Sequence, residues 1–204
     1  MFLYFVLRGR FLLFENRCFS CDVNVRDSDS GGSFVIEGYF ALFDEQTELF
    51  NNYFEKIDRG AFGDLGGCDV KALLNHDSSV VLGRTGNDTL RLSVDDKGLF
   101  GSIVINKDDS EAVNVYQRVK RGDISQCSFG FRIDDEEHEW DGDKLFSTLK
   151  RVTLFEVSVV TFPAYDKTCV SARSRFDRFY KDKLDIKKNN LRGLLNNGFK
   201  NFNK

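Results

Sequence analysis

Short apolar or alternating runs recur along the chain, and this pattern predicts a protein built mainly of β-strands. Residues 106–122 have helical spacing instead, with Asp108 or Asp109 available as the N-cap and Gly122 at the end. The runs of strand length lie at residues 34–43, 53–57, 69–74, 79–84, 89–94, 99–105, 124–131 and 145–162, with a further strand expected within 12–25. The expected fold class is α+β: a mainly antiparallel, barrel-like sheet with a few surrounding helices.

The two ends of the chain differ from its middle. The apolar start is interrupted by Arg8 and Arg10, so no stretch there is long enough to span a bilayer. Residues 174–204 carry nine Lys and Arg against three Asp, a net charge of +6 that leaves about −9 for the rest of the chain. We expect an N-terminal extension that supplies a first strand, and a weakly helical basic tail outside the core.

Composition narrows both the class of protein and the kinds of site. Hydrophobic residues make up 41% of the chain and charged residues 30%, which is typical of a soluble globular protein. The net charge of −3 argues against general nucleic-acid binding. Five cysteines without framework spacing indicate reduced thiols and an intracellular setting. Cys18 and Cys21 form at best half of a zinc site, and with two His in the chain we expect no metal and no other cofactor.

Three polar residues lie where strand packing favours apolar ones, and they are the candidate catalytic residues. Ser128 lies in an apolar and aromatic run, two residues before Gly130, where a substrate backbone could approach closely. His76 directly follows an expected strand, a position that suits a general base. Glu156 lies inside a run of β-branched residues, where a carboxylate costs several kcal/mol or so unless a cationic imidazole pairs with it. A carboxylate that orients a His, which activates a Ser, is the logic of a catalytic triad.

Each of these residues also has a plainer interpretation: a tolerated strand serine, a loop histidine with a structural hydrogen bond, and an outward-facing glutamate. Cys127 could act as the nucleophile with the same histidine. Neighbouring strand residues point to opposite faces, so only one of Cys127 and Ser128 can face His76. Ser125 is a further candidate but lies closer to the preceding turn. His138 belongs to an acidic stretch, residues 134–143, that we expect to be a solvated loop.

Several short segments occur in an order that is characteristic of one family. They are Gly38-Tyr-Phe-Ala-Leu-Phe43, Glu55-Lys-Ile-Asp-Arg-Gly-Ala-Phe62, Leu73-Leu-Asn-His-Asp77, Leu82-Gly83, Asp95-Asp-Lys-Gly-Leu99, Ile124-Ser-Gln-Cys-Ser-Phe-Gly-Phe131 and Leu154-Phe-Glu-Val-Ser-Val-Val-Thr-Phe-Pro-Ala164. In these segments the chain resembles the prohead (procapsid maturation) serine proteases of tailed bacteriophages, which are related in fold to the herpesvirus assemblins. The resemblance covers residues 34–173, which we expect to form the protease domain between an N-terminal extension and first strand (1–33) and the basic tail (174–204).

The resemblance implies Ser128 as nucleophile, His76 as base and Glu156 as the third member of a triad; the herpesvirus relatives have a second His in that third role. It implies a serine endopeptidase that cleaves the scaffolding segment of the major capsid protein, and itself, during head maturation. The implied partners are the capsid protein and the procapsid shell, with a homodimer by analogy, and no membrane or specific nucleic acid. The implied location is the host cytoplasm, inside the assembling procapsid. Backbone N–H groups near Pro163 or the side chain of Arg173 are candidate oxyanion donors.

Two main alternatives remain open from the sequence, beside a weaker one, a redox or metal role for Cys18 and Cys21. One is a protease of the same fold that uses Cys127. The other is a non-catalytic capsid-assembly or scaffolding factor, in which Ser128, His76 and Glu156 would not converge.

Overall fold

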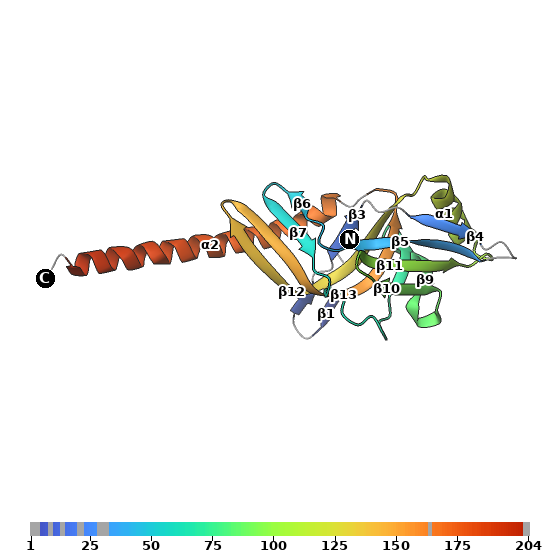
Figure 1. Ribbon diagram of the computed structural model, residues 1–204, viewed down its shortest axis with the longest axis horizontal. Coiled ribbons are helices and arrows are strands. Elements are labelled where there is room, and N and C mark those ends of the chain that lie inside the picture. The colour runs from blue at the N-terminus through green and yellow to red at the C-terminus, as the bar shows by residue number, and fades with distance from the viewer. Residues whose placement is uncertain are drawn as a thin grey trace.

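The computed structural model of the chain describes residues 5–7, 10–12, 15–19, 23–27, 33–162 and 165–201 (Figure 1). Strands dominate these residues, together with two α-helices and a short 3-10 helix, Thr85–Asn87. The strands are β1 (Phe5–Leu7), β2 (Arg10–Leu12), β3 (Glu15–Phe19), β4 (Asn24–Asp27), β5 (Phe34–Leu42), β6 (Thr47–Phe50), β7 (Tyr53–Ile57), β8 (Lys71–Leu74), β9 (Asp77–Arg84), β10 (Leu90–Val94), β11 (Gly98–Ile105), β12 (Gln126–Asp141) and β13 (Lys144–Val160). The helices are α1 (Ser110–Arg121) and α2 (Tyr165–Asn201).

Most strands belong to two sheets. A four-stranded antiparallel sheet has the order β10-β11-β5-β4, and a seven-stranded sheet has the path β3-β12-β13-β7-β6, with β8 pairing with β13 and β9 pairing with β8. Strand β13 is antiparallel to β12 but parallel to β7 and β8, so the larger sheet is mixed. The α+β class is therefore confirmed. Among the described strands neither sheet closes on itself, so the barrel-like arrangement is not observed.

The main hydrophobic core contains buried residues from both sheets and from α1. Ile36 and Phe40 of β5, Ile103 of β11 and Phe129 of β12 all have no exposed surface. Helix α1 forms where the sequence predicts it. Asp109 caps its N-terminus, accepting hydrogen bonds from two backbone N–H groups, and Gly122 ends it with φ of 87°. This helix leads directly into β12, the strand that carries Ser128.

The acidic stretch at residues 134–143 is not the solvated loop that the sequence predicts. It forms the distal half of β12 and the turn into β13, so the two strands make one long hairpin. Helix α2 packs against this hairpin and explains the difference. Trp140 packs against Phe176 and Tyr180, and the ring of His138 stacks on Phe179 with centroids 4.2 Å apart. Most side chains of residues 134–143 remain exposed, so pairing with β13 and these aromatic contacts with α2, and not burial of the whole stretch, hold the polar sequence in a strand.

Helix α2 differs from the expected basic tail in that its beginning belongs to a core. Ala172 and Phe179 are buried with Tyr53 and Leu145 in a second hydrophobic cluster. Lys183 still contacts the hairpin, donating to the carbonyl oxygen of Gly142 at 2.6 Å. The C-terminal part of α2 extends away from the sheets as a single rod (Figure 1). No helix in the part of the chain that the structure describes is both long and apolar enough to cross a membrane.

Candidate active site

His76 occupies the second position of the two-residue turn between β8 and β9. Leu74 pairs with Asp77, which leaves Asn75 and His76 in the loop. Both have positive φ, 51° and 62°, as in the type I′ turns that match the twist of a hairpin. A non-glycine residue in this region costs about 1–2 kcal/mol. Because strain of this kind tends to cluster at functional sites, the turn is a candidate for a functional constraint.

The turn is fastened to β13. The backbone N–H of Asn75 donates to the carbonyl oxygen of Val159 at 3.0 Å. Its side-chain oxygen accepts the N–H of Thr161 at 2.9 Å. The backbone N–H of His76 donates to the hydroxyl of Ser158 at 3.2 Å. The position of the histidine is thus set by the strand that carries Glu156.

The imidazole of His76 lies against the carboxylate of Glu156. Nδ1 and Oε1 are 2.7 Å apart, and the two side chains are 15% and 7% exposed. A carboxylate at Nδ1 favours the tautomer with the proton on that nitrogen. The adjacent carboxylate, Asp77, is engaged by the hydroxyl and the backbone N–H of Ser79, which lower its pKa. Glu156 is therefore the carboxylate that orients the ring.

Ser158 connects the histidine to the glutamate. Its hydroxyl donates to Oε2 of Glu156 at 2.5 Å and accepts the backbone N–H of His76. It is fully buried and lies two residues after Glu156, on the same face of β13. Each carboxylate oxygen of Glu156 thus has a donor, which compensates for burying its charge.

Ser128 lies on the same face of the sheet, one strand away. It pairs directly with Ser158 in the antiparallel register of β12 and β13, and directly opposite residues have Cβ atoms about 4.5–5.5 Å apart. Gly130 pairs with Glu156 and places no side chain beside the carboxylate. Ser128 is fully buried, and its hydroxyl donates to the carbonyl oxygen of Arg17 in β3 at 2.9 Å. The fold therefore joins His76 to Glu156 by direct contact and places Ser128 on the neighbouring strand of the same face.

The register that turns Ser128 toward this face turns Cys127 into the core. Cys127 pairs with Val159, and both are fully buried in the main hydrophobic cluster. Phe129, on the same side as Cys127, packs edge-on against Phe62 of the Gly-Ala-Phe segment at 5.6 Å. Ser125 precedes the start of β12 and is exposed. Cys127 therefore faces away from the His76–Glu156 pair.

The positive φ of His76 predicts different stabilities for the variants His76→Gly and His76→Ala. We expect His76→Gly to be about 1 kcal/mol more stable than His76→Ala, because both lose the imidazole and only glycine adopts this backbone without strain. Urea unfolding of the two variants measures the difference. The matched control is His138, which lies in a strand and has no positive φ. There we expect the opposite order, with Gly less stable than Ala by about 0.5–1 kcal/mol; the same order at both sites would contradict the turn argument.

A buried ion cluster joins β3, β7 and α2. Its members are Glu15, Arg17, Glu55 and Arg175. The guanidinium of Arg17 donates to both carboxylate oxygens of Glu55 and, at 2.6 Å, to Glu15. Arg175 of α2 donates to Glu55 at 2.7 Å and lies 3.3 Å from Glu15. Burial alone would raise the pKa of Glu55, but the two guanidinium charges outweigh it and lower that pKa. Arg17 thus contacts Ser128 through its backbone, and its side chain shares the carboxylates of Glu15 and Glu55 with Arg175 of α2.

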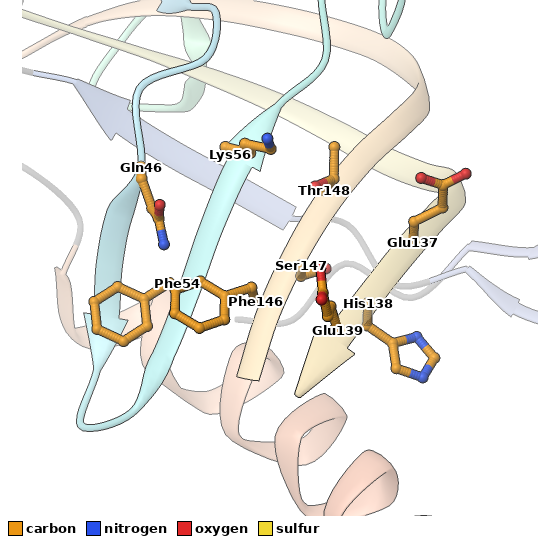
Figure 2. A pocket seen from close by; sticks show the side chains of 9 residues that line it. All are labelled: Gln46, Phe54, Lys56, Glu137, His138, Glu139, Phe146, Ser147 and Thr148. Atoms are coloured by element: carbon orange, nitrogen blue, oxygen red, sulfur yellow. The ribbon is translucent and has the colours of Figure 1, made fainter. Parts of the chain in front are cut away.

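A separate hollow of about 230 Å³ lies on the distal hairpin, where β7, β12 and β13 meet (Figure 2). It shares no residue with the His76 site. Phe54 and Phe146 stack at its floor with ring centroids 5.0 Å apart, and Lys56 and Glu137 are among its polar residues. His138 also lines it, and its ring stacks on Phe179 of α2.

Other candidates from the sequence lie apart from the site or outside the described residues. Arg173 is exposed on α2, with its guanidinium 5.8 Å from the ring of Phe50. Cys21 and Pro163 lie outside the described residues, and Cys18 is described only as part of β3. In the described part of the chain, no three His, Cys, Asp or Glu side chains gather as a metal-ligand set.

Comparison with known proteins decides the family. A model of the caudovirus prohead serine protease matches residues 21–182, well over half of the chain. The chain belongs to this family. It is therefore a serine protease, and members of this family are phage enzymes of head assembly.

No curated protein matches the chain. Among solved structures, the chain is similar to the capsid assembly protease gp21 of bacteriophage T4, with 11% identity and a TM-score of 0.43 over 73% of this chain and 99% of that one.

Proposed function

We propose that this serine protease is an endopeptidase whose catalytic residues are Ser128, His76 and Glu156. The observation that carries the assignment is the sheet register. It puts Ser128 opposite Ser158, on the face where Glu156 binds the imidazole of His76. Ser128 is the one serine in β12, and the neighbouring Cys127 points into the core.

The reaction is acyl transfer. Ser128 Oγ attacks the carbonyl carbon of the scissile peptide while Nε2 of His76 takes the hydroxyl proton. The carboxylate of Glu156 stabilises the resulting imidazolium, which then donates the proton to the leaving amine as the C–N bond breaks. Water, activated by the same histidine, cleaves the acyl-enzyme and restores Ser128. No cofactor takes part in these steps.

The reaction requires one local movement of the nucleophile. In the present arrangement the hydroxyl of Ser128 points to the carbonyl of Arg17. Rotation about the Cα–Cβ bond exchanges this bond for one to His76. Catalytic hydrogen bonds in unliganded enzymes are often completed only when the substrate is bound, so this rotation belongs to substrate binding in our proposal.

The substrate that we propose is the scaffolding segment of the major capsid protein, with the protease itself as a second substrate. The proposal is supported by membership of the prohead protease family. The enzyme then works inside the assembling procapsid in the host cytoplasm, in contact with the shell, and a homodimer remains a prediction. A relationship of the fold to the herpesvirus assemblins also remains a prediction.

Labelling with a fluorophosphonate, which phosphonylates an activated serine, tests the catalytic assignment. We expect one adduct, which peptide mapping places on Ser128, in the wild-type protein and in Cys127→Ala. The Ser128→Ala protein should show none, and His76→Gly should label at least about 100-fold more slowly because the base is missing. An adduct on another serine, or equal labelling of Ser128→Ala, would remove Ser128 from the proposal.

A further inference from the structure

The strongest unassigned feature is the hydroxyl of Ser158, which the triad does not use. It is fully buried in the middle of β13. It makes two hydrogen bonds, and both partners belong to the candidate catalytic apparatus: the carboxylate of Glu156 at 2.5 Å and the backbone N–H of His76 at 3.2 Å. If position 158 only had to fill the face of the strand, valine would pack better than serine, and valine is the residue on either side of it.

We propose that Ser158 is a positioning residue that fixes His76 and Glu156 relative to each other. This inference rests on the proposed function of that pair. The hydroxyl accepts a hydrogen bond from the backbone N–H of His76 and donates one to Oε2 of Glu156. It therefore restrains both the backbone that carries the imidazole and the carboxylate that binds it. One group therefore sets both the position of the histidine and the orientation of the carboxylate that binds it.

The hydrogen bond from the His76 N–H to Ser158 helps to hold the histidine in its left-handed backbone conformation. The turn has φ of 62° at a residue that carries a large side chain, so it is held by its contacts and not by its own conformational preference. Of the two backbone N–H groups of the turn, that of His76 donates to Ser158 and that of Asn75 donates to Val159. Removing the Ser158 hydroxyl therefore releases the backbone of His76, while the bonds of Asn75 keep the hairpin in place and Glu156 still contacts the imidazole.

Ser158 is also the residue of β13 directly opposite Ser128. Ser158 therefore lies next to all three candidate catalytic residues: it is hydrogen-bonded to His76 and Glu156 and pairs with Ser128 across the sheet. A displacement of about 1 Å in such a site can lower a rate about 100-fold. We expect the fluorophosphonate labelling rate of Ser128 to fall by about 10–100-fold in Ser158→Ala.

The chain offers a matched control for this variant. Ser147 is a second buried serine of β13, and its hydroxyl also donates to a carboxylate, that of Glu136, at 3.0 Å. We expect Ser147→Ala to label at the wild-type rate. Ser158→Thr, which keeps the hydroxyl, should recover most of the rate lost in Ser158→Ala. Labelling of Ser158→Ala at the wild-type rate would overturn the proposal.

A second readout does not depend on activity. The chain has two His, so selective ¹⁵N-histidine labelling gives one amide signal and one pair of ring-nitrogen signals for each, assigned with His138→Gln. In Ser158→Ala the His76 amide should exchange with solvent at least about 10-fold faster and its ring signals should shift, while those of His138 stay unchanged. In Ser147→Ala the His76 signals should not move. Unchanged His76 signals in Ser158→Ala would overturn the positioning role even if Ser128 is the nucleophile. Absence of any labelling in the wild-type protein would count against the proposed nucleophile, while these signals would still decide the role of Ser158.

Discussion

Co-expression of the protease with its cognate major capsid protein is expected to remove an N-terminal segment of the capsid protein, and Ser128→Ala is expected to abolish this cleavage. The expected loss is at least about 10⁴-fold, because the acyl-enzyme cannot form without the nucleophile. Intact mass of the capsid protein after assembly measures the outcome. The substitution removes one buried oxygen from a fully buried side chain, so the shells themselves should still assemble and can be confirmed by electron microscopy.

The matched control for this experiment is the residue next to the nucleophile. Cys127 is also fully buried but faces the main core, and Cys127→Ala should cleave the capsid protein as the wild type does. Cleavage by Ser128→Ala together with no cleavage by Cys127→Ala would reverse the assignment of the two residues. Assembled shells that remain uncleaved by the wild type would favour an assembly factor without proteolytic activity toward this substrate.

Substitution of Glu55 is expected to have the largest effect on stability. Glu55 is paired with both Arg17 and Arg175, so Glu55→Leu leaves two buried guanidinium groups to share the single carboxylate of Glu15. Removing one partner of a buried ion pair typically costs about 3–5 kcal/mol. Urea unfolding measures the loss. Glu137→Leu is the control, since Glu137 is 75% exposed and its ion pair within the described part of the chain, with Lys150, is 4.0 Å long. We expect this substitution to change stability by less than about 0.5 kcal/mol. An equal, small effect at both positions would contradict this account of the ion cluster.

The same cluster sets a direction for the pH dependence of stability. The pKa of Glu55 is lower in the folded protein than its ordinary value of 4.5. The contribution of Glu55 is therefore complete above pH 4.5 and is lost as the pH falls through the lower, folded-state pKa. In Glu55→Leu this part of the acid dependence should be absent. Unfolding curves recorded between neutral and acidic pH for the wild type and the variant test the sign.

The local parts of the site could be predicted from the sequence, because they depend on residues close together in the chain. The strand before His76, the helix that ends at Gly122 and the apolar strand around Ser128 all follow from periodicity and turn chemistry. Glu156 stood out because a carboxylate inside a run of β-branched residues requires a partner. The structure supplies that partner as His76, at 2.7 Å.

What the sequence did not reveal depends on register and on contacts between distant segments. Ser158 looks like any strand serine until pairing places it opposite Ser128 and beside the turn of His76. Glu136 and Trp140 indicate a polar loop until α2 covers their face of the hairpin. The number of strands predicts sheet closure, whereas β13 pairs with β12 along one edge and divides its other edge between two parallel strands, β7 and β8.

The position of Glu55 between the two ends of the chain has a consequence for how the enzyme is made. Its two cations are separated from it by 38 residues on one side and 120 on the other. At about 5–20 residues per second, a ribosome needs roughly 6–24 s after Glu55 to reach Arg175. Throughout that interval the nascent chain holds only one of the two charges that neutralise this carboxylate. The buried ion cluster can therefore be completed only after the start of α2 has been synthesised, 120 residues after Glu55.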